Sequence, residues 1–162
     1  MAKRILVVDD EPKVVTVIQR RLESAGYEVL AAYDGNEALS KARSENPDLI
    51  ILDLILPKLN GYQVCAILKR DKSYKPIPIL ILTARSQEED IEEGMRVGAD
   101  EYLTKPFKNE VLLAKIEELL SKVEANKAKL LKEKIEKEKE IGEKLLKEAE
   151  RMGVMRKEKK LK

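Results

Sequence analysis

The stretch Asp48–Pro57 reads DLIILDLILP and places one carboxylate, Asp53, inside a run of aliphatic residues. Four apolar residues precede Asp53 and three follow it. A run that is apolar at every position is typical of a strand covered on both faces, as in a parallel sheet. A charge is costly to bury in such a place unless it has a partner. The rest of the sequence must therefore supply a partner for Asp53.

The residues on either side of this stretch alternate between strand and helix patterns. Short aliphatic runs bounded by turn residues predict strands, and apolar residues at helical spacing predict helices. The predicted strands cover residues 5–8, 27–32, 49–53, 77–84 and 101–104. The predicted helices cover residues 10–26, with Asp10 as the cap, then 34–46, 61–70 and 87–99, and a last helix that begins near 112.

Five strand–helix units in strict alternation predict an α/β fold with a parallel sheet and helices on both faces. The first, third and fourth strands are apolar throughout and belong in the centre, whereas strands 27–32 and 101–104 are mixed and belong at the edges. This pattern fits a flavodoxin-like, doubly wound five-stranded sheet with the strand order 2-1-3-4-5. We expect this domain to cover residues 1–122.

Polar residues follow the carboxyl ends of four predicted strands. Asp9 and Asp10 follow the first, Asp53 the third, Thr83 ends the fourth and Lys105 follows the fifth. In the order 2-1-3-4-5 the first and third strands are neighbours, so three carboxylates would share one pocket. Such a group needs a cation, and both Lys105 and a bound Mg²⁺ could supply it, since oxygen ligands with open positions suit Mg²⁺. A carboxylate beside Mg²⁺, a lysine and a hydroxyl can act as a nucleophile toward phosphorus and form an acyl phosphate.

The motifs ILVVDDE, DLIILDLILPKLNGYQV, PILILTA and GADEYLTKPF, in this order and spacing, resemble the receiver domain of bacterial two-component response regulators over residues 3–121. The resemblance implies the following roles. Asp53 is the phosphoacceptor, and Asp9, Asp10, Asp53 and the backbone carbonyl of Ile55 hold Mg²⁺. Thr83 and Lys105 contact the phosphoryl group. The switch residues are Thr83, Tyr102 and Pro106, and the peptide bond before Pro106 is cis.

The same resemblance implies a signalling protein rather than an enzyme. It would phosphorylate itself from a phosphodonor and hydrolyse its own aspartyl phosphate slowly, because Ile55 and Arg85 hold the two positions that adjust this rate and neither is a general base. Aspartyl-nucleophile phosphatases of the haloacid dehalogenase type are a remote alternative. Their nucleophile opens a D-x-D motif after the first strand, where this sequence reads DDE.

The last part of the chain, residues 123–162, differs in composition. Residues 122–162 contain 15 Lys and Arg against 9 Asp and Glu, a charge of +6, whereas residues 1–121 carry −4. The composition predicts that the last helix continues at least to Arg151, with a stop near Gly153. Leu131, Ile135 and Leu145 lie near a heptad seam that Glu138 and Gly142 interrupt, so a coiled coil and a solvated helix remain two alternatives. We expect the basic end, residues 156–162, to be disordered.

The expected partners follow from this organisation. The chain contains no histidine, so a histidine kinase or phosphotransfer protein would donate the phosphoryl group, and the surface of the fourth helix, fifth strand and fifth helix would act on an unidentified protein target. A homodimer formed on phosphorylation is a second output, in which the tail dimerises or serves as a scaffold for an absent effector domain. We expect a cytoplasmic protein, with neither a membrane nor nucleic acid as a partner.

Overall fold

The computed structural model describes residues 1–153 and contains five strands and five helices in strict alternation. The strands are β1 (Arg4–Val8), β2 (Glu28–Ala32), β3 (Leu49–Leu52), β4 (Ile79–Thr83) and β5 (Glu101–Thr104). The helices are α1 (Pro12–Ser24), α2 (Gly35–Glu45), α3 (Gly61–Arg70), α4 (Glu88–Arg96) and α5 (Asn109–Arg151). The predicted alternation is confirmed.

The strands form one parallel sheet in the order β2-β1-β3-β4-β5. The apolar strands β1, β3 and β4 are central and almost wholly buried, and the mixed strands β2 and β5 form the edges. The predicted flavodoxin-like sheet and its strand order are therefore confirmed.

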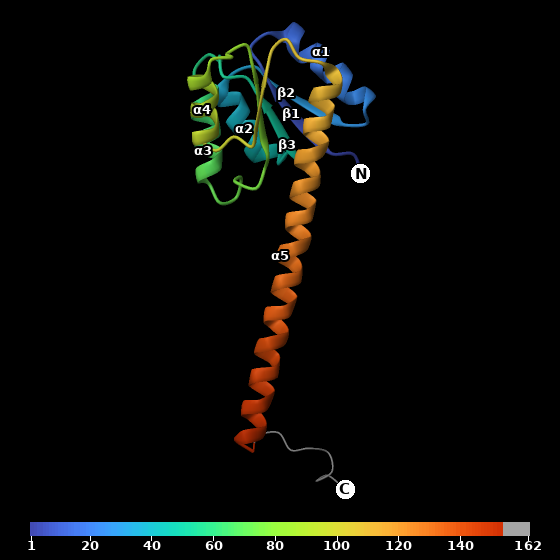
Figure 1. Ribbon diagram of the computed structural model, residues 1–162, viewed down its shortest axis with the longest axis vertical. Coiled ribbons are helices and arrows are strands. Elements are labelled where there is room, and N and C mark those ends of the chain that lie inside the picture. The colour runs from blue at the N-terminus through green and yellow to red at the C-terminus, as the bar shows by residue number, and fades with distance from the viewer. Residues whose placement is uncertain (154–162) are drawn as a thin grey trace. The chain divides into compact units, whose positions relative to one another are not determined.

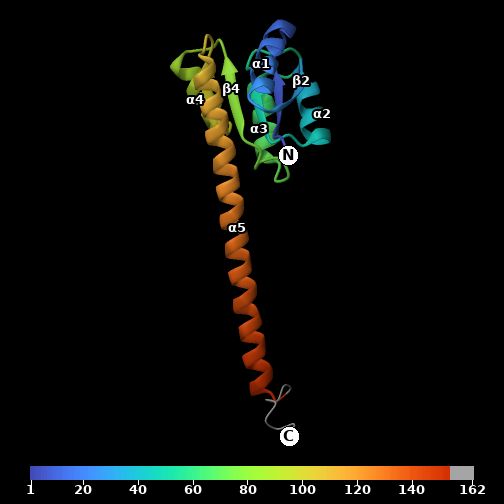
Figure 2. The same ribbon diagram turned by 90° about the vertical axis from the view of Figure 1, so that its right-hand side faces the viewer.

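Helices cover both faces of the sheet (Figure 1). Apolar side chains of α2 and α3 pack on one face, and those of α1 and the first turns of α5 pack on the other. Figure 2 views the sheet from the side that α1 and the start of α5 cover. Both core clusters consist mainly of Ile, Leu and Val, as a chain with no Trp and one Phe requires.

The start of α1 differs from the sequence prediction. We expected Asp10 to cap this helix, but Glu11 is the N-cap residue, its side chain makes no capping hydrogen bond, and Pro12 opens the helix. Proline suits that position because its missing N–H would have no helical partner there. Asp10 thus lies outside the helix, and its exposed carboxylate is not used as a cap.

The described chain divides into two compact units, of which the first is Met1–Val123 and the second begins at Glu124. Leu112, Ile116 and Leu119 of α5 are buried in the first unit. In the second unit the helix continues to Arg151 with almost every residue exposed, which confirms the predicted helical extension. The domain boundaries remain a prediction, and the basic segment expected to be disordered lies outside the described residues.

No helix within residues 1–153 has the length and apolar character that a membrane span requires.

Cys65 is fully buried in α3. Its thiol lies 3.8 Å from the carbonyl oxygen of Val97, and burial raises the pKa of the thiol to about 12. Cys65 is therefore a core residue.

Gly61, the first residue of α3, lets this helix approach the end of β3. A Cβ atom added to Gly61 would collide with the backbone oxygen of Asp53 and would lie 2.7 Å from the Cα of Leu54. Neither backbone group can rotate away. The Asn60 side chain accepts a hydrogen bond from the Gln63 amide and fixes the helix start at this place.

We expect Gly61→Ala to lower the free energy of unfolding by about 1–3 kcal/mol, as overpacking does in other cores. Urea unfolding followed by circular dichroism would measure the change. Gly142→Ala is the matched control, because nothing lies within 4 Å of a Cβ at Gly142 and alanine favours the helix. Equal stability of Gly61→Ala and the parent chain would show that the close approach is unimportant.

Candidate phosphoryl-transfer site

The ends of two neighbouring strands bring Asp9 and Asp53 together. Val8 and Leu52 are register partners at the ends of β1 and β3, and each is followed directly by an aspartate. The Asp53 amide donates a hydrogen bond of 3.0 Å to the carbonyl oxygen of Val8, which holds the two strand ends in place. The side chains of Asp9 and Asp53 are both buried.

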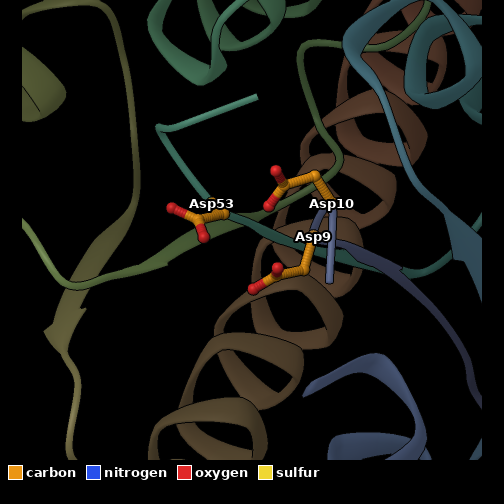
Figure 3. A group of neighbouring side chains, drawn as sticks. All are labelled: Asp9, Asp10 and Asp53. Atoms are coloured by element: carbon orange, nitrogen blue, oxygen red, sulfur yellow. The ribbon is translucent and has the colours of Figure 1, made fainter. Parts of the chain in front are cut away.

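Asp10 completes a group of three carboxylates (Figure 3). One oxygen from each of Asp9, Asp10 and Asp53 lies within 4.8 Å of the others. Asp10 is exposed and therefore forms the solvent side of the group. The sequence prediction that these three side chains share one pocket is consistent with this geometry.

Lys105 brings the positive charge to this group. Its Nζ donates to Asp9 Oδ2 at 2.6 Å and to Asp53 Oδ2 at 3.1 Å. Lys105 directly follows β5, and its backbone amide donates a 2.8 Å hydrogen bond to the carbonyl oxygen of Thr83 in β4. The Lys105–Pro106 peptide bond is cis, the geometry that the resemblance implies.

The other carboxylate oxygens of Asp9 and Asp53 accept hydrogen bonds from the main chain. The Glu11 amide donates to Asp9 Oδ1 at 3.0 Å, and the Ile55 amide donates to Asp53 Oδ1 at 3.1 Å. Both donors lie two residues beyond their acceptor, an arrangement in which an aspartate stabilises a turn of its own loop. Each of these two carboxylates thus uses one oxygen for its own loop and the other for Lys105.

The charges in the site are unbalanced, since among the described residues one ammonium group, hydrogen bonded to Asp9 and Asp53, accompanies three carboxylates. Burial raises the pKa of Asp9, and the nearby charge of Asp53 acts in the same direction, while the hydrogen bond from Lys105 opposes both. Burial alone would lower the pKa of Lys105, but its hydrogen bond to Asp9 and the charge of Asp53 outweigh burial and raise it. Lys105 is therefore firmly protonated, and excess negative charge remains.

The donor set of the site fits a hard divalent cation. Asp9, Asp10 and Asp53 offer only oxygen atoms, as Mg²⁺ prefers, and the exposed side of the group is open for water ligands. The described part of the chain brings no histidine or cysteine to this group, so a zinc-type site is not favoured. The side chain of Ile55 is a hydrocarbon without a donor atom, so only its backbone carbonyl is a candidate ligand.

Thr83 and Tyr102 lie on the side of β4 and β5. Thr83 is fully buried at the end of β4, and its Oγ1 accepts a hydrogen bond of 3.4 Å from the Arg85 amide. The Tyr102 hydroxyl donates to the carbonyl oxygen of Arg85 at 2.8 Å, and burial raises the pKa of Tyr102 to about 12. The same short loop thus binds both side chains, although Tyr102 makes no hydrogen bond to the carboxylate group.

Sequence reasoning missed two residues near this loop. The Tyr62 hydroxyl donates to the carbonyl oxygen of Asp90 at 3.1 Å, and the Asp90 side chain pairs with Arg85 at 3.4 Å. These contacts connect α3, α4 and the loop after β4. No motif marks them, because two of the acceptors around this loop are backbone carbonyls, which every residue has.

Comparison with known proteins gives one consistent result. The family model described as "Response regulator receiver domain" matches residues 5–117. The chain is 49% identical over 124 residues to the Bacillus subtilis alkaline phosphatase synthesis transcriptional regulatory protein PhoP, covering 76% of this chain and 51% of that protein. It is 46% identical over 121 residues to the DNA-binding dual master transcriptional regulator RpaA of Synechocystis, covering 75% and 50%.

The solved structures agree with the sequence comparison. A CheY-like response regulator receiver domain protein from Methanospirillum hungatei superposes with a TM-score of 0.74 at 30% identity, covering 78% of this chain and 99% of that one. A response regulator from Chloroflexus aurantiacus gives 0.72 at 35% identity, covering 75% and 99%. The chain spans about half the length of the curated relatives it matches.

We expect Asp9→Asn to stabilise the protein at neutral pH. Folding raises the pKa of Asp9 above its value in the unfolded chain. The folded protein therefore gains stability from protonated Asp9 at low pH, below the unfolded pKa. This stability is lost as the pH rises through the pKa of Asp9 in the folded protein. The repulsion of two like charges about 4 Å apart amounts to about 1–4 kcal/mol between bulk water and a protein surface, and the lost attraction between Asp9 and Lys105 makes the net gain smaller than this.

Urea unfolding in EDTA at pH 4 and at pH 7.5 would test this expectation. The gain should be larger at pH 7.5. Asp71→Asn, which removes a carboxylate outside the group, directly after α3, is the control. A gain that is equal at both pH values would contradict the electrostatic explanation.

Proposed function

Because the chain belongs to the response regulator receiver family, we propose that it accepts a phosphoryl group on Asp53 from a histidine kinase or phosphotransfer protein. The observation that carries this proposal is the position of Lys105 Nζ, within hydrogen-bond distance of both Asp9 and Asp53. The family assignment removes support for the dehalogenase-type phosphatase alternative. A receiver acts as a signalling domain, and its chemistry is directed at its own aspartate.

In the proposed reaction a carboxylate oxygen of Asp53 attacks the phosphorus atom. A new oxygen–phosphorus bond forms, the bond between phosphorus and the donor breaks, and the donor leaves with the electron pair. Lys105 would turn from the free Asp53 carboxylate to the phosphoryl oxygens, since phosphorylation removes that negative charge and supplies a larger one. The Thr83 hydroxyl would donate a hydrogen bond to another phosphoryl oxygen.

We propose Mg²⁺ as the cofactor, held by Asp9, Asp10, Asp53 and the backbone carbonyl of Ile55. When bound, the ion would neutralise charge on the transferred group. The support for this ion is the all-oxygen donor set, with one carboxylate open to solvent. Asp10 is free for this role because Glu11, not Asp10, is the N-cap residue of α1.

The proposed switch is the loop after β4. If the Thr83 hydroxyl turned to the phosphoryl group, its hydrogen bond from the Arg85 amide would break. The carbonyl oxygen of Arg85 also accepts a hydrogen bond from the Tyr102 hydroxyl, and the Arg85 side chain forms an ion pair with Asp90 of α4. Movement of this loop would therefore affect both β5 and α4. This supports a change of the α4–β5–α5 surface on phosphorylation.

The aspartyl phosphate should be slow to hydrolyse. Ile55 has no basic group, and Arg85 is a cation paired with Asp90, so neither can activate a water molecule. A phosphoryl half-life of only seconds for the purified protein would contradict this expectation.

Incubation with acetyl phosphate and Mg²⁺ is expected to add one phosphoryl group to the intact protein, measured by mass spectrometry at low pH. Asp53→Asn should abolish the adduct, and Asp10→Asn should reduce it because it removes one proposed ligand. Asp71→Asn is the matched control and should react like the parent chain. Undiminished labelling of Asp53→Asn would assign the phosphoacceptor elsewhere.

The output of the switch has two candidates. The two curated relatives are named as transcriptional regulators, and RpaA as a DNA-binding one. This chain covers only half the length of each. Docking of a protein target on the α4–β5–α5 surface is the first candidate. A tail-mediated dimer or scaffold is the second, favoured by the apolar side chains that are exposed on the second half of α5. A cytoplasmic location remains a prediction.

Light scattering with Mg²⁺, before and after addition of beryllium fluoride, would separate the two outputs. If the tail is the output, activation should raise the mass of the parent chain but not that of a variant with Ile135→Glu and Leu145→Glu. A mass that stays at the monomer value in both states would favour a separate protein target. A rise in both proteins would place the dimer interface outside the tail.

A further inference from the structure

The second half of α5 exposes a row of apolar side chains on one face of the helix. The exposed fractions of Leu131, Ile135 and Leu145 are 60%, 51% and 61%. These residues belong to a series whose members are alternately four and three positions apart, the spacing of the contact face (the seam) of a coiled coil. The seam consists of Leu131, Ile135, Glu138, Gly142, Leu145 and Ala149. The seam therefore has large residues at one end, a small residue at the other, and a charge beside a glycine in the middle.

A parallel pair of such helices would be poorly matched. In a parallel pair each seam residue meets its own copy, so Glu138 would face Glu138 and Gly142 would face Gly142. The flanking positions would also set Lys134 against Lys139 of the other copy on both sides of the pair. Only Ile141 and Leu146 would meet favourably across the flanks.

We propose that the tail pairs with the tail of a second copy of this chain in antiparallel orientation. Centring the pair between Glu138 and Gly142 sets Glu138 against Gly142 of the other copy. Ile135 then meets Leu145, and Leu131 meets Ala149. Every layer joins a large side chain to a smaller or matching one, which fills space without overlap.

The charges support the same orientation. Lys134, Ile141 and Glu148 lie on the same flank of the seam. In an antiparallel pair residues on the same flank face each other, so Lys134 meets Glu148 of the other copy, and the two-fold symmetry makes two such ion pairs. Ile141, which is 57% exposed, meets its own copy on the two-fold axis. Gly142 leaves room for the Glu138 side chain to reach Lys139 of the other copy, which offsets the approach of the two Lys139 ammonium groups.

The antiparallel pairing involves residues 131–149 alone and goes beyond the proposed phosphorylation. All residues of the seam belong to the second unit, so the orientation of the pair does not depend on Asp53. Activation could change how much dimer forms but not which residues face each other. The test is therefore made in EDTA without a phosphodonor, so that its failure is distinct from failure of the proposed function.

Disulfide trapping of the full chain distinguishes the orientations. We expect mild oxidation of an equimolar mixture of Ile135→Cys and tagged Leu145→Cys to give mainly the mixed dimer. Neither variant alone should cross-link, because the two copies of position 135 would lie about 15 Å apart along an antiparallel pair. The parent chain is the control, since its Cys65 is buried. Cross-linking of each variant with itself would show a parallel pair, and no cross-link in any mixture would show that the tails do not pair; both results overturn the proposal.

A charge reversal gives a second test without added cysteines. Lys134→Glu should weaken the antiparallel dimer roughly tenfold, because two attractive pairs become repulsive. In a parallel pair the same change would strengthen association, since the introduced carboxylate would then face Lys139 of the other copy. Adding Glu148→Lys should restore the dimer, whereas Lys137→Glu, on the outer face of the helix, should have no effect. Sedimentation at low salt would measure all four proteins, and a stronger Lys134→Glu dimer would overturn the proposal.

Discussion

The contact of the Lys105 ammonium group with Asp9 and Asp53 is the constraint on which the site depends. Three carboxylates at the edge of one sheet repel one another, and the part of the chain that the structure describes brings one ammonium group into hydrogen-bond distance of two of them. Lys105 reaches them because β5 runs parallel to β1 and β3, so that Lys105 follows its strand at the same end of the sheet, and because its amide is hydrogen bonded to the carbonyl oxygen of Thr83. The order and direction of the strands therefore place this lysine beside the carboxylates.

The packing of α3 connects the core to this site. Gly61 lies against the backbone of Asp53 and Leu54, and the buried residues Val64 and Leu68 anchor the helix to the sheet. The position of the Asp53 carboxylate is thus fixed on one side by the strand partner β1 and on the other by a helix. Asp53 held in this way, beside a loop that contacts Thr83, Tyr102 and Asp90, supports the proposed switch, because a local change of charge would move the loop while the core stays in place.

The two units of the chain use apolar residues in different ways. In the first unit they fill two clusters, one on each face of the sheet, and few large ones remain exposed. In the second unit the apolar residues of the helix are exposed, and the buried area that would stabilise so long a helix is missing within the described chain. The proposed partner, a second copy of the same helix, would cover these side chains and match the charges beside them.

The sequence by itself determined the order of elements, the central and edge strands, the extension of α5 and the set of polar residues at the strand ends. These features are local: a strand or helix follows from the periodicity of neighbouring side chains, and a strand end from the first charge after an apolar run. Only the tertiary structure decided which polar groups touch. Lys105 is 96 residues from Asp9 and 52 from Asp53, and Tyr102 binds a backbone carbonyl that no motif marks. A local error, Asp10 as a helix cap, has a related cause. Several residues before α1 could cap it, and the choice depended on where the end of β1 places the chain.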